Sequence, residues 1–170
     1  LDVACESKSL EMVEILASLN LDKDSLCAAF LIPLCESSHL SLPHIQENYS
    51  PQIYMLCQGV TQMEAIKALQ NNSGTAASAN QIDNVRRMLL AMVDDVRAVV
   101  IKLAERLVYL RVVKNSDEET RVLVAKEISN IYAPLANRLG IGQLKWELED
   151  IAFRYLHPDV YKKIAKLLDE

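Results

Sequence analysis

The chain has 170 residues, of which 51% are hydrophobic and 24% are charged; this length fits one compact domain, and this composition excludes intrinsic disorder. With only 4 glycines and 5 prolines, the sequence favours an all-α fold over a β-sandwich or barrel, which would need many turns. The formal net charge of −5 predicts no direct binding to nucleic acid, and no apolar run approaches the roughly 20 residues that span a membrane.

Apolar side chains recur at helical spacing near the start of the chain: Leu10, Val13, Leu16 and Leu19. They predict a helix over residues 9–19 with this face buried. Asp22 or Asp24 can cap a second helix that runs to about Glu36. Pro33 lies inside that helix, where it removes a backbone donor and crowds the carbonyl four residues back. We therefore expect a kink or an early end there.

Two further helices are expected to begin at prolines, a short one over 43–49 and a longer one from Pro51 to about Leu69. Residues 71–80 read NNSGTAASAN. They are small, polar and uncharged, which is typical of a loop. A helix over 81–93 is expected to follow this loop, with its apolar side chains at helical spacing.

Four more helices are predicted in the remainder of the chain, over 95–113, 116–138, 143–155 and 158–169. Ser116 followed by Glu119 is a capping box for the second of them, and Gly140 should end it. Trp146 is expected to be a packing anchor, with the domain that follows this chain as an alternative partner to the chain's own core. No alternating pattern predicts a strand, so we expect an all-α bundle of about eight or nine helices without a significant sheet.

The helix that precedes residue 113 is apolar almost all round, as expected of a helix in the middle of a domain. Its apolar residues are Val96, Val99, Val100, Ile101, Leu103, Leu107, Val108, Leu110 and Val112. Lys102, Glu105, Arg106 and Tyr109 share one narrow stripe, and buried charges are costly unless they are paired. Two interpretations stay open: an internal ion-pair network of Glu105 with Lys102 and Arg106, or one wall of a site for a phosphorylated or metal-bound ligand.

The four cysteines follow no spacing typical of a zinc site: Cys5, Cys27, Cys35 and Cys57. Reduced, mostly buried thiols are expected, which favours a cytoplasmic protein. The chain opens Leu1-Asp2-Val3 with no methionine and no signal-like run. We therefore expect it to be a fragment of a longer protein.

Three segments carry a resemblance to a known family. They are residues 83–107, which include DNVRRMLLAM and IKLAERL, residues 131–141 (IYAPLANRLGI) and residues 147–158 (ELEDIAFRYLHP). Together they resemble the N-terminal hydrolase-type domain of RelA/SpoT proteins, which make and destroy the alarmone (p)ppGpp. The resemblance implies the all-helical HD domain over residues 1–170.

Active members of that family hold a manganese ion with a first His, a His-Asp pair and a later Asp. The resemblance aligns these four ligands with Lys8, Ile32, Pro33 and Glu105. Ile32 and Pro33 offer no side-chain donor and Lys8 brings a positive charge, so a single carboxylate remains for an ion that needs several ligands. The resemblance therefore implies no catalytic residue, no metal, and no manganese or other cofactor in this chain.

Two further pairs depart from the family pattern. Glu36 and Ser37 stand where active members have a Glu-Asp pair that assists the attacking water, and Val108 and Tyr109 stand where they have His-Asn. This pattern resembles the gammaproteobacterial RelA branch. It implies a degenerate hydrolase domain that regulates or supports the adjacent synthetase domain of the same chain, in a GTP pyrophosphokinase whose C-terminal domains contact the ribosome.

Two alternatives remain open. One is a residual metal-dependent ppGpp 3′-pyrophosphohydrolase that uses Glu36, Glu105 and some other ion. The other is an effector domain that binds a guanine nucleotide. Such a ligand would draw on the second half of the chain, because residues 1–80 hold 3 basic and 9 acidic side chains and residues 81–170 hold 15 and 14. The candidate contacts are Arg86, Arg87, Arg97, Lys102, Arg106 and Tyr109.

Overall fold

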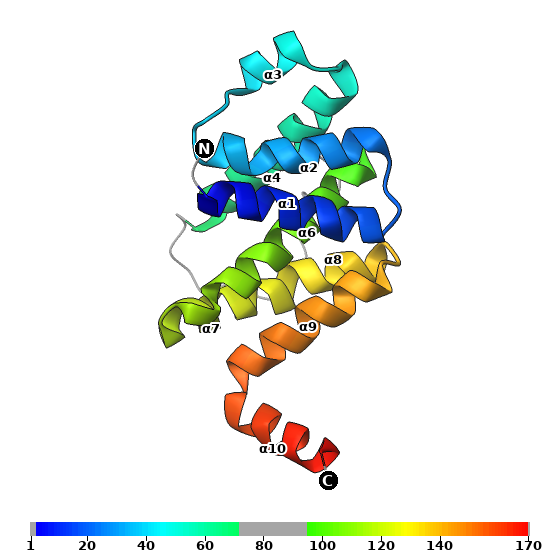
Figure 1. The fold of residues 1–170 in the computed structure, drawn as a ribbon. Coiled ribbons are helices and arrows are strands. Elements are labelled where there is room, and N and C mark those ends of the chain that lie inside the picture. The colour runs from blue at the N-terminus through cyan, green and yellow to red at the C-terminus, as the bar shows by residue number, and fades with distance from the viewer. Residues whose placement is uncertain (1–2, 72–94, 170) are drawn as a thin grey trace. The chain divides into compact units, whose positions relative to one another are not determined.

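The computed structural model describes residues 3–71 and 95–169, and all regular structure within these ranges is helical (Figure 1). The expected all-α fold is therefore confirmed. The predicted loop after residue 71, the predicted helix over 81–93, and the candidates Arg86 and Arg87 lie outside the described residues. None of the described helices is both long and apolar enough to cross a membrane.

The chain divides into two compact units, residues 1–105 and 106–170. The boundary falls within α6 (Val96–Val112).

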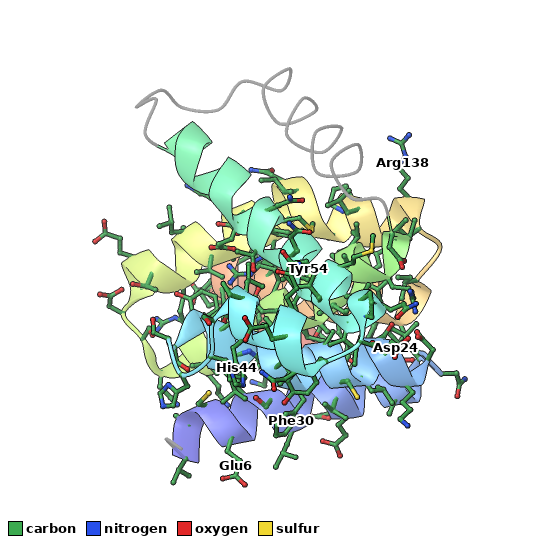
Figure 2. The ribbon with its side chains drawn as sticks, turned by 90° about the horizontal axis from the view of Figure 1, so that it is seen from above. Glu6, Asp24, Phe30, His44, Tyr54 and Arg138 are labelled. Atoms are coloured by element: carbon green, nitrogen blue, oxygen red, sulfur yellow. The ribbon has the colours of Figure 1, made fainter. Side chains whose placement is uncertain are left out.

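Among the described residues of the first unit, four helices precede α6: α1 (Val3–Ser18), α2 (Lys23–Glu36), α3 (Leu42–Asn48) and α4 (Pro51–Asn71). Helix α1 lies beside α2 (Figure 1; Figure 2), α2 packs on α4, and α4 also packs on α3. Each start that the sequence places at a proline is observed, since Pro43 lies in the first turn of α3 and Pro51 begins α4. Ser41 caps α3 by accepting a hydrogen bond from the backbone N–H of His44.

The predicted buried face of α1 is only partly confirmed: Leu16 is buried, whereas Val13 and Leu19 are half-buried and Leu10 is exposed. The helix begins at Val3, six residues before the predicted start, and its buried residues are Cys5, Ser9, Met12 and Leu16. Leu10 is instead 55% exposed. The small Ser9 lies on the buried face, where its hydroxyl donates a hydrogen bond of 2.9 Å to the carbonyl of Phe30 on α2. Hydrophobicity alone does not show that a serine lies at the contact.

Helix α2 follows its prediction at both ends, with Asp22 as the residue before its first turn and Glu36 as its last residue. The early end expected at Pro33 is wrong. A proline removes only its own N–H donor, and the donors after it remain, so the N–H of Ser37 still bonds to the carbonyl of Pro33 at 3.1 Å. The hydroxyl of Ser37 donates to that same carbonyl at 2.9 Å.

The second unit continues from α6 through further helical segments. They are η1 (Val113–Asn115), α7 (Glu118–Glu127), η2 (Ile128–Tyr132), α8 (Ala133–Arg138), α9 (Gly142–Leu156) and α10 (Pro158–Leu168). Helix α9 packs on α7 and α8, and α10 follows it after a single residue, His157. The bounds of α9 and α10 confirm the predicted helices 143–155 and 158–169 to within one residue.

The single long helix expected over 116–138 is wrong in two respects. Its cap is Asp117, whose carboxylate accepts a hydrogen bond of 2.8 Å from the N–H of Thr120, whereas Ser116 ends the preceding short helix η1. The helix is also interrupted by η2, a π-helical turn. Pro134 follows two residues after this turn; it lacks an N–H and would crowd the carbonyl of Asn130 in a regular helix, which explains the wider turn.

Helix α6 is buried over most of its length, from Ala98 to Val108. The exceptions among the predicted core positions are its two ends, where Val96 is 56% and Val112 is 59% exposed. Trp146 on α9 is also wrong as a packing anchor within this chain, because it is 68% exposed.

All four cysteines are free thiols, as expected, and Cys5 and Cys57 are buried. Burial, with a smaller contribution from Cys35, raises the pKa of the Cys57 thiol to about 12. A thiol with so high a pKa carries almost no thiolate near neutral pH and is a poor nucleophile.

Gly140 ends α8 in the left-handed region, with φ of 74°. The N–H of Gly140 bonds to the carbonyl of Asn137, and the N–H of Ile141 bonds to that of Ala136, which is the Schellman arrangement. A Cβ added at Gly140 would have nothing within 4 Å. Any cost of adding one is therefore a backbone cost and not a clash.

We predict that Gly140→Ala lowers the free energy of unfolding by about 1–2 kcal/mol, the cost of holding an L-residue in the left-handed region. Gly142→Ala is the matched control, because Gly142 also has open space around it but no positive φ and lies in the first turn of α9. We expect the control to be neutral or to stabilise by up to about 1 kcal/mol. Urea denaturation of both variants measures the difference, and equal effects would contradict the backbone explanation.

Candidate functional site

The structure brings together the positions that the sequence aligns with a metal centre. Helix α1 supplies Lys8, the C-terminal turns of α2 supply Ile32, Pro33 and Glu36, and α6 supplies Glu105. All of them lie within the first unit. The Nζ atom of Lys8 lies 2.9 Å from Oε2 of Glu36 and 3.4 Å from Oε1 of Glu105. One ammonium group thus joins carboxylates from two other helices.

Glu105 is held between two ammonium groups. Its side chain is 1% exposed, and its second oxygen, Oε2, lies 3.2 Å from Nζ of Lys102, which is also 1% exposed. Lys102 pairs in addition with Glu64 on α4, which reaches solvent. Positive and negative groups therefore alternate from one side of the unit to the other, in the order Glu36, Lys8, Glu105, Lys102 and Glu64. We call these five residues the ion-pair chain.

The ion-pair chain supports the interpretation of the charged stripe on α6 as an internal ion-pair network. The network also includes Lys8 and Glu64, which the sequence analysis did not name as partners. Lys102 does pair with Glu105, as expected. The contacts of Lys8 and Glu64 with this pair are not foreseeable from the sequence, because the four helices that supply them are joined only in the folded chain. Carboxylates and ammonium groups this deep in a protein are tolerated when each has an oppositely charged neighbour.

The protonation of Lys8 follows from these neighbours. Burial by itself would lower the pKa of Lys8, but the negative charges of Glu105 and Glu36, with their hydrogen bonds, outweigh it and raise the pKa above its ordinary value. The group therefore stays positive throughout the neutral range. A lysine in this state has three N–H donors and no lone pair, so it cannot act as a base or as a metal ligand.

The remaining aligned positions carry no charged group that could take part in a reaction. Ile32 is 2% exposed, and Pro33 is buried beside it. Ser37 is engaged at the end of α2, where its hydroxyl bonds to the carbonyl of Pro33 and lies 3.4 Å from Sγ of Cys5. None of these three side chains contributes a charged group.

The donor set at the four aligned positions does not fit a divalent cation. Ile32 and Pro33 have no donor atom, Lys8 is a cation, and both oxygens of Glu105 already face ammonium groups. A hard or borderline ion requires several N or O ligands converging on it. Across residues 3–71 and 95–169 no group of three or more His, Cys, Asp or Glu side chains is placed to hold a metal.

Arg97, a candidate nucleotide contact, is instead part of a brace between helix starts. Its guanidinium lies 2.6 Å from Oδ2 of Asp95, just before α6, and 2.5 Å from Oδ2 of Asp22, just before α2. The hydrogen bonds from Arg97 lower the pKa of Asp95 despite a small opposing effect of burial. Asp95 also accepts the backbone N–H of Arg97 and so caps α6.

Arg106 and Tyr109 meet in the second unit. The guanidinium of Arg106 lies over the ring of Tyr109, 4.8 Å from its centroid, and 3.5 Å from Oε1 of Glu127 on α7. Arg106 is 7% exposed. Glu127 is not a partner of Arg106 that the sequence predicts, since the stripe on α6 suggested Glu105.

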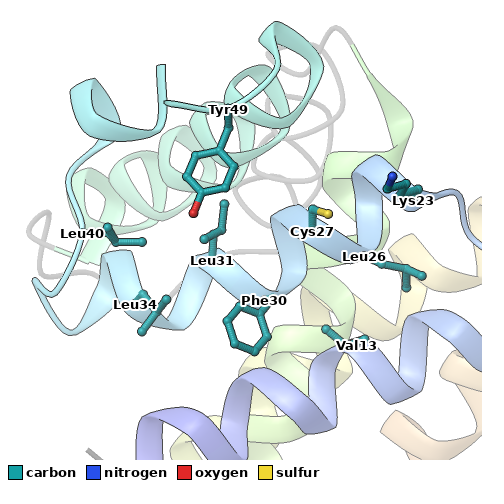
Figure 3. A pocket seen from close by; sticks show the side chains of 9 residues that line it. All are labelled: Val13, Lys23, Leu26, Cys27, Phe30, Leu31, Leu34, Leu40 and Tyr49. Carbon is teal, nitrogen blue, oxygen red and sulfur yellow. The ribbon is translucent and has the colours of Figure 1, made fainter. Parts of the chain in front are cut away.

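A pocket that the sequence did not suggest lies in the first unit. It has a volume of about 400 Å³ and is lined mainly by apolar side chains of α2, with Val13 of α1 and with Leu40 and Tyr49. The side chain of Tyr49 points toward Leu31 across this pocket (Figure 3). Its polar groups are few, so it lacks the converging acids and bases that a catalytic centre needs.

Comparison with known proteins agrees with this fold. Residues 3–142 match the model of the HD domain. The chain is 58% identical, over 96% of its length, to a GTP pyrophosphokinase of Escherichia coli strain K12, and 59% identical, over 94%, to one of Photobacterium angustum. It is also 40% identical, over 92%, to a probable guanosine-3′,5′-bis(diphosphate) 3′-pyrophosphohydrolase of Synechocystis. The chain spans only 20–22% of the length of these relatives.

The brace around Arg97 predicts a pH dependence. Because the pKa of Asp95 is lowered in the folded chain, its contribution to stability is present above the ordinary aspartate pKa of about 3.9 and is lost as the pH falls through the lowered value. We expect Arg97→Gln to cost about 0.2–1 kcal/mol at neutral pH, since these groups are partly exposed. The difference from the wild type should shrink below about pH 4, and chemical denaturation across the acid range measures it. A difference that stays constant down to strongly acidic pH would contradict this account.

Proposed function

The chain belongs to the HD-domain family, and on that premise we propose that it is a degenerate hydrolase domain that supports and regulates a (p)ppGpp synthetase domain in the same, longer protein. The observation that carries this proposal is the ion-pair chain, in which Lys8 and Lys102 engage both oxygens of Glu105. The likeness to GTP pyrophosphokinases supports the second half of the proposal. By itself the chain would be no enzyme.

Removal of the 3′-pyrophosphate from ppGpp requires water to be activated as a nucleophile. A metal ion does this by lowering the pKa of a bound water and by neutralising charge on the phosphate. In this chain a protonated lysine stands between Glu36 and Glu105, and an ammonium group neither binds water as a Lewis acid nor leaves an open coordination position. Of the two acids that contact Lys8, Glu36 is the more exposed, and it is paired with Lys8.

An exposed apolar surface supports a role in contacts with the rest of a longer protein. Within the second unit, Trp146 on α9 is 68% exposed, and on α10 Leu167 and Leu168 are 70% and 81% exposed. Helix α10 has no buried residue, although Val160, Ile164, Leu167 and Leu168 share one face at helical spacing. Grouped apolar side chains on a surface commonly mark an interface. We propose the synthetase domain as the occupant.

The proposed role beside a synthetase domain also bears on the location of the protein and on its contacts with the ribosome and with nucleotides. A protein of this kind would work in the cytoplasm and would contact the ribosome through segments other than this chain. A guanine-nucleotide effector is not favoured by the geometry, because Arg97 is held by Asp22 and Asp95 and Arg106 lies against Glu127.

We predict that the purified chain releases no pyrophosphate from ppGpp in the presence of Mn²⁺, Mg²⁺ or Zn²⁺, because no residue of the site can place and activate a metal-bound water. An HD-domain hydrolase with its ligands intact serves as the positive control. The assay is chromatography of the nucleotides over time. Metal-dependent release that Glu105→Gln abolishes would refute the proposal and support a residual hydrolase.

We also predict that Trp146→Ala changes the rate of pyrophosphate transfer in the longer protein, while the melting temperature of the 170-residue chain stays within about one degree, because this side chain buries little surface in the chain itself. Leu123→Ala is the matched control, since Leu123 on α7 is 69% exposed. Equal synthesis rates for wild type and Trp146→Ala would remove α9 from the proposed interface.

A further inference from the structure

We propose that the apolar pocket beside α2 is a binding site for an anionic amphiphile, a molecule with a linear alkyl chain of about ten carbons and a carboxylate head group. The alkyl chain would lie along α2, and the head group would pair with the ammonium group of Lys23. The pocket uses none of the residues of the ion-pair chain, so this site would be independent of the proposed function.

One face of α2 forms most of the pocket. The side chains that it contributes beyond Lys23 recur at helical spacing and are Leu26, Cys27, Phe30, Leu31 and Leu34. Phe30 is 37% exposed, and Tyr49, which lies across the pocket, is 41% exposed (Figure 3). Large apolar side chains that are grouped at a surface commonly mark a binding site. The volume of about 400 Å³ also lies within the range of roughly 300–1,000 Å³ that is usual for small-molecule sites.

The length of the apolar lining determines the length of the alkyl chain. Leu26 and Leu34 are about 12 Å apart along the axis of α2, at a rise of about 1.5 Å per residue. An extended chain advances by about 1.2 Å per bond, so about ten carbons cover this distance. Each CH₂ group that is buried should strengthen binding by about threefold to fourfold.

The head group follows from the charge at one end of the pocket. Lys23 is the only charged side chain of the lining and lies in the first turn of α2, at one end of the row of apolar side chains (Figure 3). Within the part of the chain that the structure describes, its ammonium group has no hydrogen bond or ion pair. Its acidic neighbours Asp22 and Asp24 do not line the pocket, and Asp22 is paired with Arg97. The positive end of the α2 dipole adds to the preference for an anion.

The first experiment compares three probes that share a decyl chain and differ in the head group: decanoate, decanol and decyltrimethylammonium. Isothermal titration calorimetry of the 170-residue chain, with each probe below its micellar range, measures the dissociation constants. We expect decanoate to bind about threefold to tenfold more tightly than decanol, because only the carboxylate pairs with Lys23. Decyltrimethylammonium should bind least tightly. Octanoate should bind roughly tenfold more weakly than decanoate, because it buries two fewer CH₂ groups.

The second experiment removes the charge of Lys23. Lys23→Gln should weaken the binding of decanoate by about threefold to tenfold and leave that of decanol unchanged. Lys126→Gln is the matched control, because Lys126 is an exposed lysine of α7 that does not line the pocket. The control should bind both probes as the wild type does.

The third experiment tests where the probe binds. Cys27 lines the pocket and is half-buried, whereas Cys35 is half-buried on the same helix and does not line it. Saturating decanoate should slow the alkylation of Cys27 by iodoacetamide at least fivefold and leave the rate at Cys35 unchanged, as measured by mass spectrometry of the peptides. Cys27→Phe should also abolish binding by filling the pocket. If that variant does not fold, the protection of Cys27 in the wild type decides the location.

Four results would overturn the inference. Decyltrimethylammonium that binds as tightly as decanoate, or a Lys23→Gln variant with unchanged affinity for decanoate, would refute an anionic ligand. Absence of decanoate binding below the micellar range, or unchanged alkylation of Cys27 in its presence, would refute the ligand site and leave the pocket as a contact for an apolar segment of the longer protein.

Discussion

A carboxylate with almost no contact with water sits on α6, and the arrangement of the first unit depends on how its charge is balanced. Glu105 is 1% exposed and receives an ammonium group at each oxygen. Isolated, such a charge would be prohibitively costly in a protein interior; paired on both sides, it becomes a point at which helices must meet in one register. Lys8 fixes α1 and Glu36 fixes α2, while Lys102 extends the contact to Glu64 of α4. A hydrophobic core would tolerate small shifts between these helices, but a buried ion pair does so far less.

The sequence predicts much of this fold because many helix ends are signalled locally. Asp22, Pro51 and Pro158 mark helix starts, and Gly140 marks an end, through the chemistry of their own backbone or side chain. The errors occur where the deciding contact comes from elsewhere in the chain. On α1 the buried Ser9 donates a hydrogen bond to the carbonyl of Phe30 on another helix, and the apolar periodicity of residues 9–19 does not predict this contact.

The candidate site likewise combines features that the sequence predicts with features that only the structure shows. The resemblance to the family aligns Lys8, Ile32, Pro33 and Glu105 with the positions of the metal ligands. The side chains of Ile32 and Pro33 have no donor atom, and this is clear from the sequence alone. What stands in place of the ligands is a property of the folded chain, because the ion-pair chain draws its members from four helices. Glu64 is the clearest case: nothing in its neighbours along the sequence distinguishes it from other surface acids, and only the structure joins it to Lys102.

The alternation of charges in the ion-pair chain also makes its inner members interdependent. Lys8, Glu105 and Lys102 each contact two oppositely charged neighbours, so the replacement of any one of them removes a charge that two other residues contact. Lys8→His alone would weaken the support of Glu105 and would leave Ile32 and Pro33 without a donor atom. A substitution within such a network costs the least stability when the neighbouring charges change with it.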